Sequence, residues 1–264
     1  MTGLLNVARQ VRKSFRKHFL VSVHSEIGFS ALPLESILSA QQALENILRN
    51  LGFIECRQVI QGQFTFETKA DESAKLSQEA SPLGLLFISQ TPRRELQILS
   101  NRLIYSDFSY DGFEDFLSRL RDLWGTIAPV IGLTEQHLVN KIGLRKINSI
   151  VMEPVSSFQD ALSIFNSALF SIARSGLVIK EAFKVTEEVT VLDDRDGNIC
   201  LLRTKLQKRN ENGLEANLDF DLVRLSENNF AKTFADVLPA LNQSHFDLFL
   251  WAITAELIKL MEAE

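Results

Sequence analysis

The chain has 264 residues, of which 45% are hydrophobic and 23% are charged, and its formal net charge is −5. This length and composition suit one large or two small globular domains, and they exclude a wholly disordered chain. The acidic balance also excludes a protein that is basic over its entire surface.

Cysteine usage and hydropathy predict the compartment. The two cysteines, Cys56 and Cys200, are too few for a disulfide framework, which indicates a reducing cytoplasm. No apolar run approaches the ~18 residues that a bilayer-spanning helix needs. The basic start of the chain lacks the continuous apolar stretch of a signal peptide. We therefore expect a cytoplasmic protein without a membrane segment.

The first 17 residues contain five basic side chains and no acidic one. Apolar residues recur between them at helical spacing, which predicts a short basic amphipathic helix or arm. Such a helix suits docking on the protein body, contact with an acidic partner or nucleic acid, or contact with a membrane surface. The basic residues are Arg9, Arg12, Lys13, Arg16 and Lys17.

The next part of the chain alternates between strand and helix patterns. Period-two apolar residues predict strands, and i, i+3, i+4 spacing predicts helices. The expected elements are a strand at 18–30, a helix at 36–51, a strand at 53–69, a polar loop at 71–81, a buried strand at 84–90, a strand or bent pair at 95–108, and a helix from 113 that ends at Pro129 and Gly132.

The second half predicts a similar series, namely a strand at 136–151, a helix at 158–173, strands at 182–192, 199–208 and 214–225, and C-terminal helices at 230–241 and 246–261. Asp-Gly at 196–197 and Asn-Gly at 212–213 supply the positive φ angles that tight hairpin turns require. The three strands should therefore form an antiparallel meander. Pro239 is expected to break the final helix.

Both halves thus share the order strand-helix-strand-strand-strand-helix, offset by roughly 115 residues. We interpret this as an α+β tandem repeat, with residues 1–17 as an arm, 18–135 as the first unit and 136–264 as the second. Each unit would contribute an antiparallel sheet covered by helices on one face. Whether the two sheets join or pack side by side stays open.

Catalytic and metal-binding patterns are missing from the sequence. It carries no Gly-x-Ser-x-Gly elbow, no phosphate-binding Gly-rich loop and no dinucleotide fingerprint. His18, His24 and Glu26 share one strand face, but solvated polar side chains explain that arrangement better than a metal site. We expect no catalytic residue, no metal and no cofactor, which favours a non-enzymatic protein.

The central Gly-Leu-Arg-Lys-Ile-Asn stretch begins at Gly143 and ends at Asn148. A glycine within a strand indicates a bulge or a close backbone approach. Lys141 and Arg145 share one face of this strand. If it lies beside the first strand, Glu26 and Arg145 could form a partly buried ion pair that fixes the register. A structural role for this pair is favoured over ligand contact.

Four short motifs carry a family resemblance. They are Glu-Ile-Gly-Phe at 26–29, Gly-Leu-Arg-x-Ile-Asn at 143–148, His-Phe at 245–246, and Ala-Ile-Thr-Ala-Glu-Leu at 252–257. Together they resemble a sporadically distributed, uncharacterised bacterial family of about this length. The sequence departs from that family at Lys146, where an aromatic residue is usual, and in lacking a Pro-rich segment before the first strand. The resemblance transfers no catalytic residue.

Scattered occurrence is typical of defence-associated genes. The resemblance therefore implies a non-enzymatic interaction component, a sensor, adaptor or neutralising protein, of a bacterial defence or toxin–antitoxin operon, with a protein partner encoded nearby. Exposed edge strands would also favour a homodimer. Two alternatives stay open. One is a nucleic-acid-binding accessory subunit that uses the basic arm. The other is a small-ligand binder or enzyme with a site around His24, Glu26 and Arg145.

Overall fold

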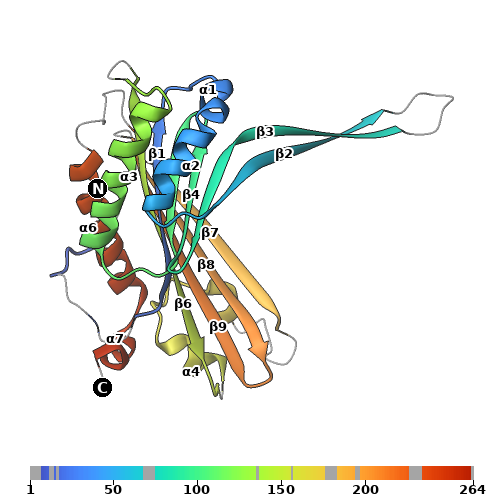
Figure 1. Ribbon diagram of the computed structural model, residues 1–264. Helices are drawn as coiled ribbons and strands as arrows, with labels where there is room; N and C mark the ends of the chain where they lie inside the picture. The colour runs from blue at the N-terminus through green and yellow to red at the C-terminus, as the bar shows by residue number, and fades with distance from the viewer. Residues whose placement is uncertain are drawn as a thin grey trace.

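The structure is a computed structural model, drawn as a ribbon in Figure 1. It describes residues 7–11, 15, 18–67, 75–134, 137–155, 157–175, 183–193, 197–225 and 234–262. Within these ranges, no helix is both long enough and apolar enough to cross a membrane.

The protein is built on one antiparallel sheet of nine strands in the order β2-β3-β4-β5-β1-β6-β9-β8-β7. At its centre β1 (Leu20–Phe29) pairs with β6 (Val139–Met152). The strands beyond β1 are β5 (Arg102–Asp107), β4 (Arg93–Leu99), β3 (Lys75–Gln90) and β2 (Glu55–Glu67), and those beyond β6 are β9 (Gly213–Leu225), β8 (Asn198–Asn210) and β7 (Val185–Asp193). The α+β class is confirmed, and the two expected sheets form one.

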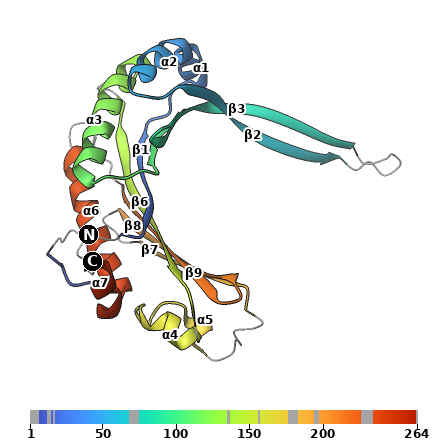
Figure 2. The same ribbon diagram turned by 60° about the horizontal axis from the view of Figure 1, so that its bottom comes forward.

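Helices cover one face of this sheet, and Figure 2 shows them along the outer side of its curve. They are α1 (Leu34–Ser39), α2 (Gln41–Asn50), α3 (Phe113–Val130), α4 (Phe158–Ser163), α5 (Ser171–Arg174), α6 (Phe234–Ala252) and α7 (Ala255–Glu262). Val23, Ile27, Ile142 and Leu144 point to this helix face and are fully buried. The opposite face, which carries Glu26 and its neighbours, is the open face.

The meander of β7, β8 and β9 is confirmed, and residues 95–108 form the bent pair β4 and β5. The polar loop expected at 71–81 is wrong over residues 75–81, because β3 begins at Lys75, which pairs with Glu67 of β2. Residues 71–74 lie outside the described residues. Backbone hydrogen bonds join β2 and β3 into a two-stranded ribbon, which extends beyond the body of the sheet in Figure 1. A polar composition does not reveal such pairing.

The amphipathic helix expected at residues 1–17 is also wrong for the residues that the structure describes there, since 7–11 and Phe15 are not helical. The Gln10 amide donates to Asp247 Oδ1 at 2.9 Å, and Gln243 Nε2 donates to the Gln10 carbonyl at 3.0 Å. Contacts with α6 thus satisfy backbone groups that a helix would have paired internally.

The continuous helix predicted at 158–173 and the helix break predicted at Pro239 are both wrong, and one contact explains both. The chain is not helical between α4 and α5, and α6 continues through Pro239 and ends only before Ile253. The Asn166 amide donates to the Ala252 carbonyl at 2.9 Å, and the Thr254 amide donates to the Ile164 carbonyl at 2.9 Å. The two interruptions therefore satisfy each other's backbone groups, as two strands would.

Arg174 completes this junction. Its Nη2 donates to the carbonyls of Leu162 at 2.5 Å and Phe165 at 2.9 Å, and its Nε donates to the Leu169 carbonyl at 2.9 Å. The carbonyls at the end of a helix lack internal partners, so a cation beside them replaces the bonds that a continuous helix would form.

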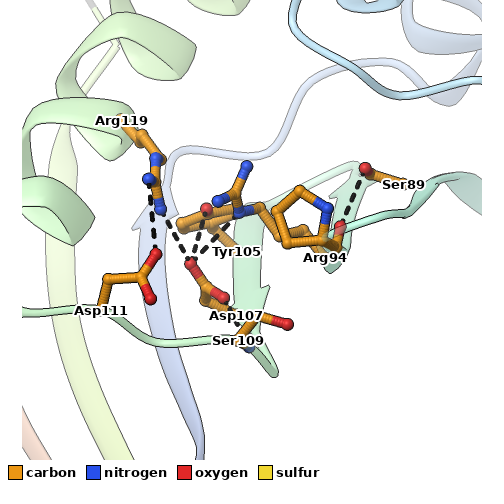
Figure 3. Close-up of polar contacts among 8 residues, drawn as sticks. Ser89, Arg94, Tyr105, Asp107, Ser109, Asp111 and Arg119 are labelled. Atoms are coloured by element: carbon orange, nitrogen blue, oxygen red, sulfur yellow. Dashed lines mark hydrogen bonds and ion pairs between the residues drawn. The ribbon is translucent and has the colours of Figure 1, made fainter.

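A buried carboxylate ties α3 to the sheet (Figure 3). The Asp107 side chain is 1% exposed. Its Oδ2 accepts from Arg94 Nε at 3.3 Å, Arg119 Nη1 at 3.3 Å and the Tyr105 hydroxyl at 3.4 Å, while Oδ1 accepts from the Ser109 amide at 2.8 Å. Because Arg119 belongs to α3 and the others to β4, β5 and the following turn, the cluster fixes this helix in place.

Replacing this carboxylate should destabilise the fold. Asp107→Asn leaves Arg94 and Arg119 without their counter-charge, so we expect the free energy of unfolding to fall by about 3 kcal/mol. Denaturation in urea measures the loss. Asp111→Asn is the matched control, because Asp111 is 69% exposed and lies 4.0 Å from Arg119. Equal losses for both variants would contradict the structural role of Asp107.

Candidate binding surface on the open face

Glu26 and Arg145 lie on the open face of two adjacent strands, as the sequence predicts. The register places His24 opposite Arg145 and Glu26 opposite Gly143. The predicted ion pair between Glu26 and Arg145 is wrong. Glu26 Oε2 instead accepts from Lys141 Nζ at 2.9 Å. The register explains this outcome, because Glu26 lies diagonally between Lys141 and Arg145 and can bind either one. Arg145 instead binds Asp219 on β9, the strand on the other side of β6.

Arg145 binds Asp219 of β9 through two parallel hydrogen bonds. Its Nε donates to Oδ1 at 2.7 Å and its Nη2 donates to Oδ2 at 2.6 Å. Arg203 of β8 donates to the same Oδ2 at 3.4 Å. The hydrogen bonds to Asp219 raise the pKa of Arg145 above its ordinary value. This geometry is the planar fork that arginine forms with carboxylates, and it crosslinks three strands.

Gly143 forms neither the bulge nor the close approach that was expected. Its pairing with Glu26 on β1 and with Val223 on β9 runs without a register shift. An added Cβ would lie 3.5 Å from Val223 Cγ2 and 3.6 Å from the Glu26 Cβ, which are ordinary van der Waals distances. The prediction was wrong because a glycine in a strand does not by itself reveal its neighbours.

His24 is a neutral, hydrogen-bonded side chain within this surface. Its Nδ1 lies 2.7 Å from Ser106 Oγ and its Nε2 lies 2.9 Å from Ser22 Oγ. Burial lowers the pKa of His24 to about 4, and the positive charge of Arg145 acts in the same direction, whereas Asp219 and Glu95 oppose it.

Charges of both signs alternate across the open face. The pKa of Asp221 is raised, mainly by burial, and Arg145 partly offsets the effect. The basic residues that strand alternation places on this face include Arg57, Arg93, Arg102, Lys141, Arg145, Arg203 and Lys205, and the acidic ones include Glu26, Glu55, Glu95, Glu187, Asp193, Glu215, Asp219 and Asp221. A nucleic-acid surface would instead show a continuous basic patch.

The other predicted site residues lie elsewhere. Asn148 is on the helix face and only 7% exposed, so it does not join Glu26 and Arg145. Arg9 is exposed. The remaining members of the basic arm, Arg12, Lys13, Arg16 and Lys17, lie outside the described residues. The described part of the chain holds no group of three or more His, Cys, Asp and Glu side chains that could hold a metal ion.

Sequence reasoning missed an apolar row on β7. Val185, Val189 and Val191 are 55%, 54% and 63% exposed, and strand alternation places all three on the open face. β7 is the last strand of the sheet, and no described strand pairs with its outer edge. We name these three valines the β7 edge patch. The spacing of valines at positions 185, 189 and 191 was the available signal.

No model of a known protein family matches the sequence, and no curated protein sequence matches it.

Removing the Arg145 fork should lower stability. Arg145→Ala leaves Asp219, which is 13% exposed, with only the longer contact to Arg203. We expect a loss of about 2 kcal/mol, which is less than two hydrogen bonds between charged groups contribute in a buried site, because the Arg145 side chain is 36% exposed and solvent screens the pair. Arg203→Ala is the control and should cost less. An unchanged melting temperature together with lost partner binding in Arg145→Ala would make Arg145 a functional residue instead.

Stability should also fall in mild acid through His24. Its pKa is about 4 in the folded protein and about 6.5 in an unfolded chain. The unfolded state therefore binds more protons, and stability is lost as the pH falls from about 6.5 to 4. Unfolding free energies measured at pH 7 and pH 4.5 should differ less in His24→Gln. The same difference in both proteins would rule out this contribution.

Proposed function

We propose that this protein is a non-enzymatic recognition component that binds a partner protein along its open face and the β7 edge patch. The observation that carries the proposal is the row of three exposed valines on an edge strand. Exposed apolar side chains beside unpaired backbone groups are typical of sites where another chain adds a strand.

The chemistry of β7 specifies the partner segment. Glu187 and Asp193 lie on the same face as Val185, Val189 and Val191. On this face, a complementary extended segment would therefore carry apolar residues beside the valines and basic residues beside Glu187 and Asp193. Its backbone would pair with the outer edge of β7 and extend the sheet. The alternating charges on the rest of the open face favour a polypeptide over a nucleic acid, because phosphates require a surplus of positive charge.

The strand order supports the tandem repeat as part of this proposal. From the centre outward, β1 is followed by β5, β4 and β3, and β6 is followed by β9, β8 and β7. The two series correspond strand for strand, with β2 added in residues 18–135. Two copies of one unit, at 18–135 and 136–264, account for this symmetry.

The family resemblance extends the proposal to a biological setting. The protein acts in the bacterial cytoplasm as the sensing, adaptor or neutralising component of a defence or toxin–antitoxin operon, and its partner is encoded nearby. The support for this setting is the set of short motifs that includes residues 26–29 and 143–148. The described structure adds the β7 edge patch as the surface on which such a partner would bind.

A charge on the β7 edge patch should abolish partner binding. We expect the double variant Val189→Lys, Val191→Lys to lose the protein that co-purifies with the full-length chain from its native host. Leu260→Lys is the matched control, since Leu260 is 57% exposed but lies on α7. Mass spectrometry of the purified complexes measures the difference.

The other outcomes discriminate between the alternatives. A partner retained by the double variant would overturn the proposed surface. A homodimer in light scattering that dissociates in the double variant would assign the patch to self-association and overturn a separate partner. DNA or RNA binding with a steep salt dependence, lost on deletion of residues 1–17, would establish the nucleic-acid alternative.

A further inference from the structure

A second candidate site lies on the helix face, apart from the proposed partner surface. A cavity of about 200 Å³ opens between α6, α7, the central strands and the segment that precedes β1. Aromatic and amide side chains line it together with one lysine, and none of the described residues that line it is acidic. The lining residues are Phe15, His18, Phe19, Leu20, Tyr110, Lys146, Asn148, Asn242, His245, Phe246, Phe249 and Met261.

His245 lines this cavity and holds a buried hydrogen-bond acceptor. Its ring lies 2.6 Å from the Leu144 carbonyl through Nε2, so Nε2 must carry the proton. Burial lowers the pKa of His245 to about 3, which keeps the ring neutral. Nδ1 then holds a lone pair. His245 is 2% exposed, and Nδ1 has no hydrogen-bond partner among the described residues.

Asn242 offers the opposite group. The residue is 1% exposed, and its Oδ1 accepts from Lys146 Nζ at 2.5 Å. The oxygen is thereby assigned as the acceptor, so Nδ2 carries two N–H donors. Nδ2 is buried and has no acceptor among the described residues. An unpaired buried polar group costs about 1–3 kcal/mol, which a ligand that supplies the missing acceptor would offset.

Lys146 and the aromatic side chains define the remaining chemistry. The Lys146 ammonium lies 5.6 Å from the centre of the Tyr110 ring, and its positive charge also lowers the pKa of His245. Phe15 stacks on Phe246 with ring centres 6.3 Å apart. The cavity therefore combines positive charge with flat apolar walls.

Volume limits the ligand to a single substituted ring. An apolar cavity of about 150 Å³ in another protein admits benzene, so about 200 Å³ accommodates a ring with one or two small substituents. A wholly apolar ligand would leave His245 Nδ1 and Asn242 Nδ2 unpaired, and a cation would be repelled by Lys146.

We propose that this cavity binds a small planar aromatic anion that carries one O–H or N–H donor. The anionic group contacts the Lys146 ammonium and the Asn242 amide nitrogen. The donor reaches Nδ1 of His245, and the ring packs among the phenylalanines.

A matched series of probes tests the ligand class. Titration calorimetry with the full-length protein would compare 2-, 3- and 4-hydroxybenzoate and indole-3-carboxylate with three controls. Benzoate lacks the donor, 4-hydroxybenzyl alcohol lacks the charge, and 4-hydroxybenzylamine reverses the charge. We expect at least one member of the first group to bind about tenfold more tightly than each control, since each control either loses a contact with the Lys146 charge or leaves His245 Nδ1 unpaired, and such losses cost about 1–3 kcal/mol.

Two variants test whether the probes bind in this cavity. Lys146→Met should weaken the best probe about tenfold or more, whereas Lys141→Met, on the opposite face of β6, should leave its affinity unchanged. Asn242→Leu provides a second, independent variant with the same expected loss. Thermal unfolding without ligand shows whether each variant is folded, and a folded Asn242→Leu suffices if Lys146→Met is not.

Three results would overturn the proposal. The first is that no aromatic anion binds the unmodified protein at millimolar concentration. The second is that benzoate, the alcohol or the amine binds as tightly as the best probe of the first group. The third is that folded Lys146→Met or Asn242→Leu retains full affinity. Each of them would leave the partner surface on β7 untouched, because Val189 and Val191 do not line the cavity.

Discussion

The antiparallel pairing of β1 with β6 is the constraint on which the rest of the structure depends. It joins strands from the two halves of the chain, and every other strand extends the sheet outward from one of them. Its register also sets the surfaces. Because side chains alternate along a strand, Arg145 points to the open face while Lys146, the next residue, points to the helix face. One slip of register would exchange the two.

Local chemistry explains which parts of the fold were predictable. Alternating apolar residues predict the meander without help from distant segments. Gly197 has the positive φ that its turn was expected to need, whereas neither Asn212 nor Gly213 has one. The helix interruptions were not predictable, because each depends on a partner far away in sequence. The interruption after α4 lies beside the interruption between α6 and α7, and Ile164, Asn166, Ala252 and Thr254 exchange backbone hydrogen bonds there. Pro239, the obvious local signal, does not end α6.

The candidate surfaces follow the same division. Strand parity placed Glu26 and Arg145 on one face, but parity does not say which acid lies closest. Arg145 binds Asp219 because β9 flanks β6 on the side away from β1 and places Asp219 diagonally beside the arginine, while Glu26 on β1 binds Lys141. Strand order, which sets these neighbours, is a property of the whole sheet. The cavity could not be predicted from the sequence for a similar reason. Its walls come from the segment before β1, from β6 and from two C-terminal helices, so no single stretch of sequence contains its pattern.

Hydrogen-bond satisfaction separates a structural cluster from a ligand site. Asp107 is as deeply buried as Asn242 and His245, but its contacts with Arg94 and Arg119 lie within the fold, and breaking them only destabilises the protein. Asn242 and His245 each have a buried nitrogen without a partner among the described residues, one a donor and the other an acceptor, at the same cavity. Each side chain also makes one hydrogen bond within the fold, His245 to the Leu144 carbonyl and Asn242 from Lys146, so stability explains one polar atom of each. Stability gives no reason for the second polar atom of each side chain, whereas a bound molecule that pairs with both nitrogens does.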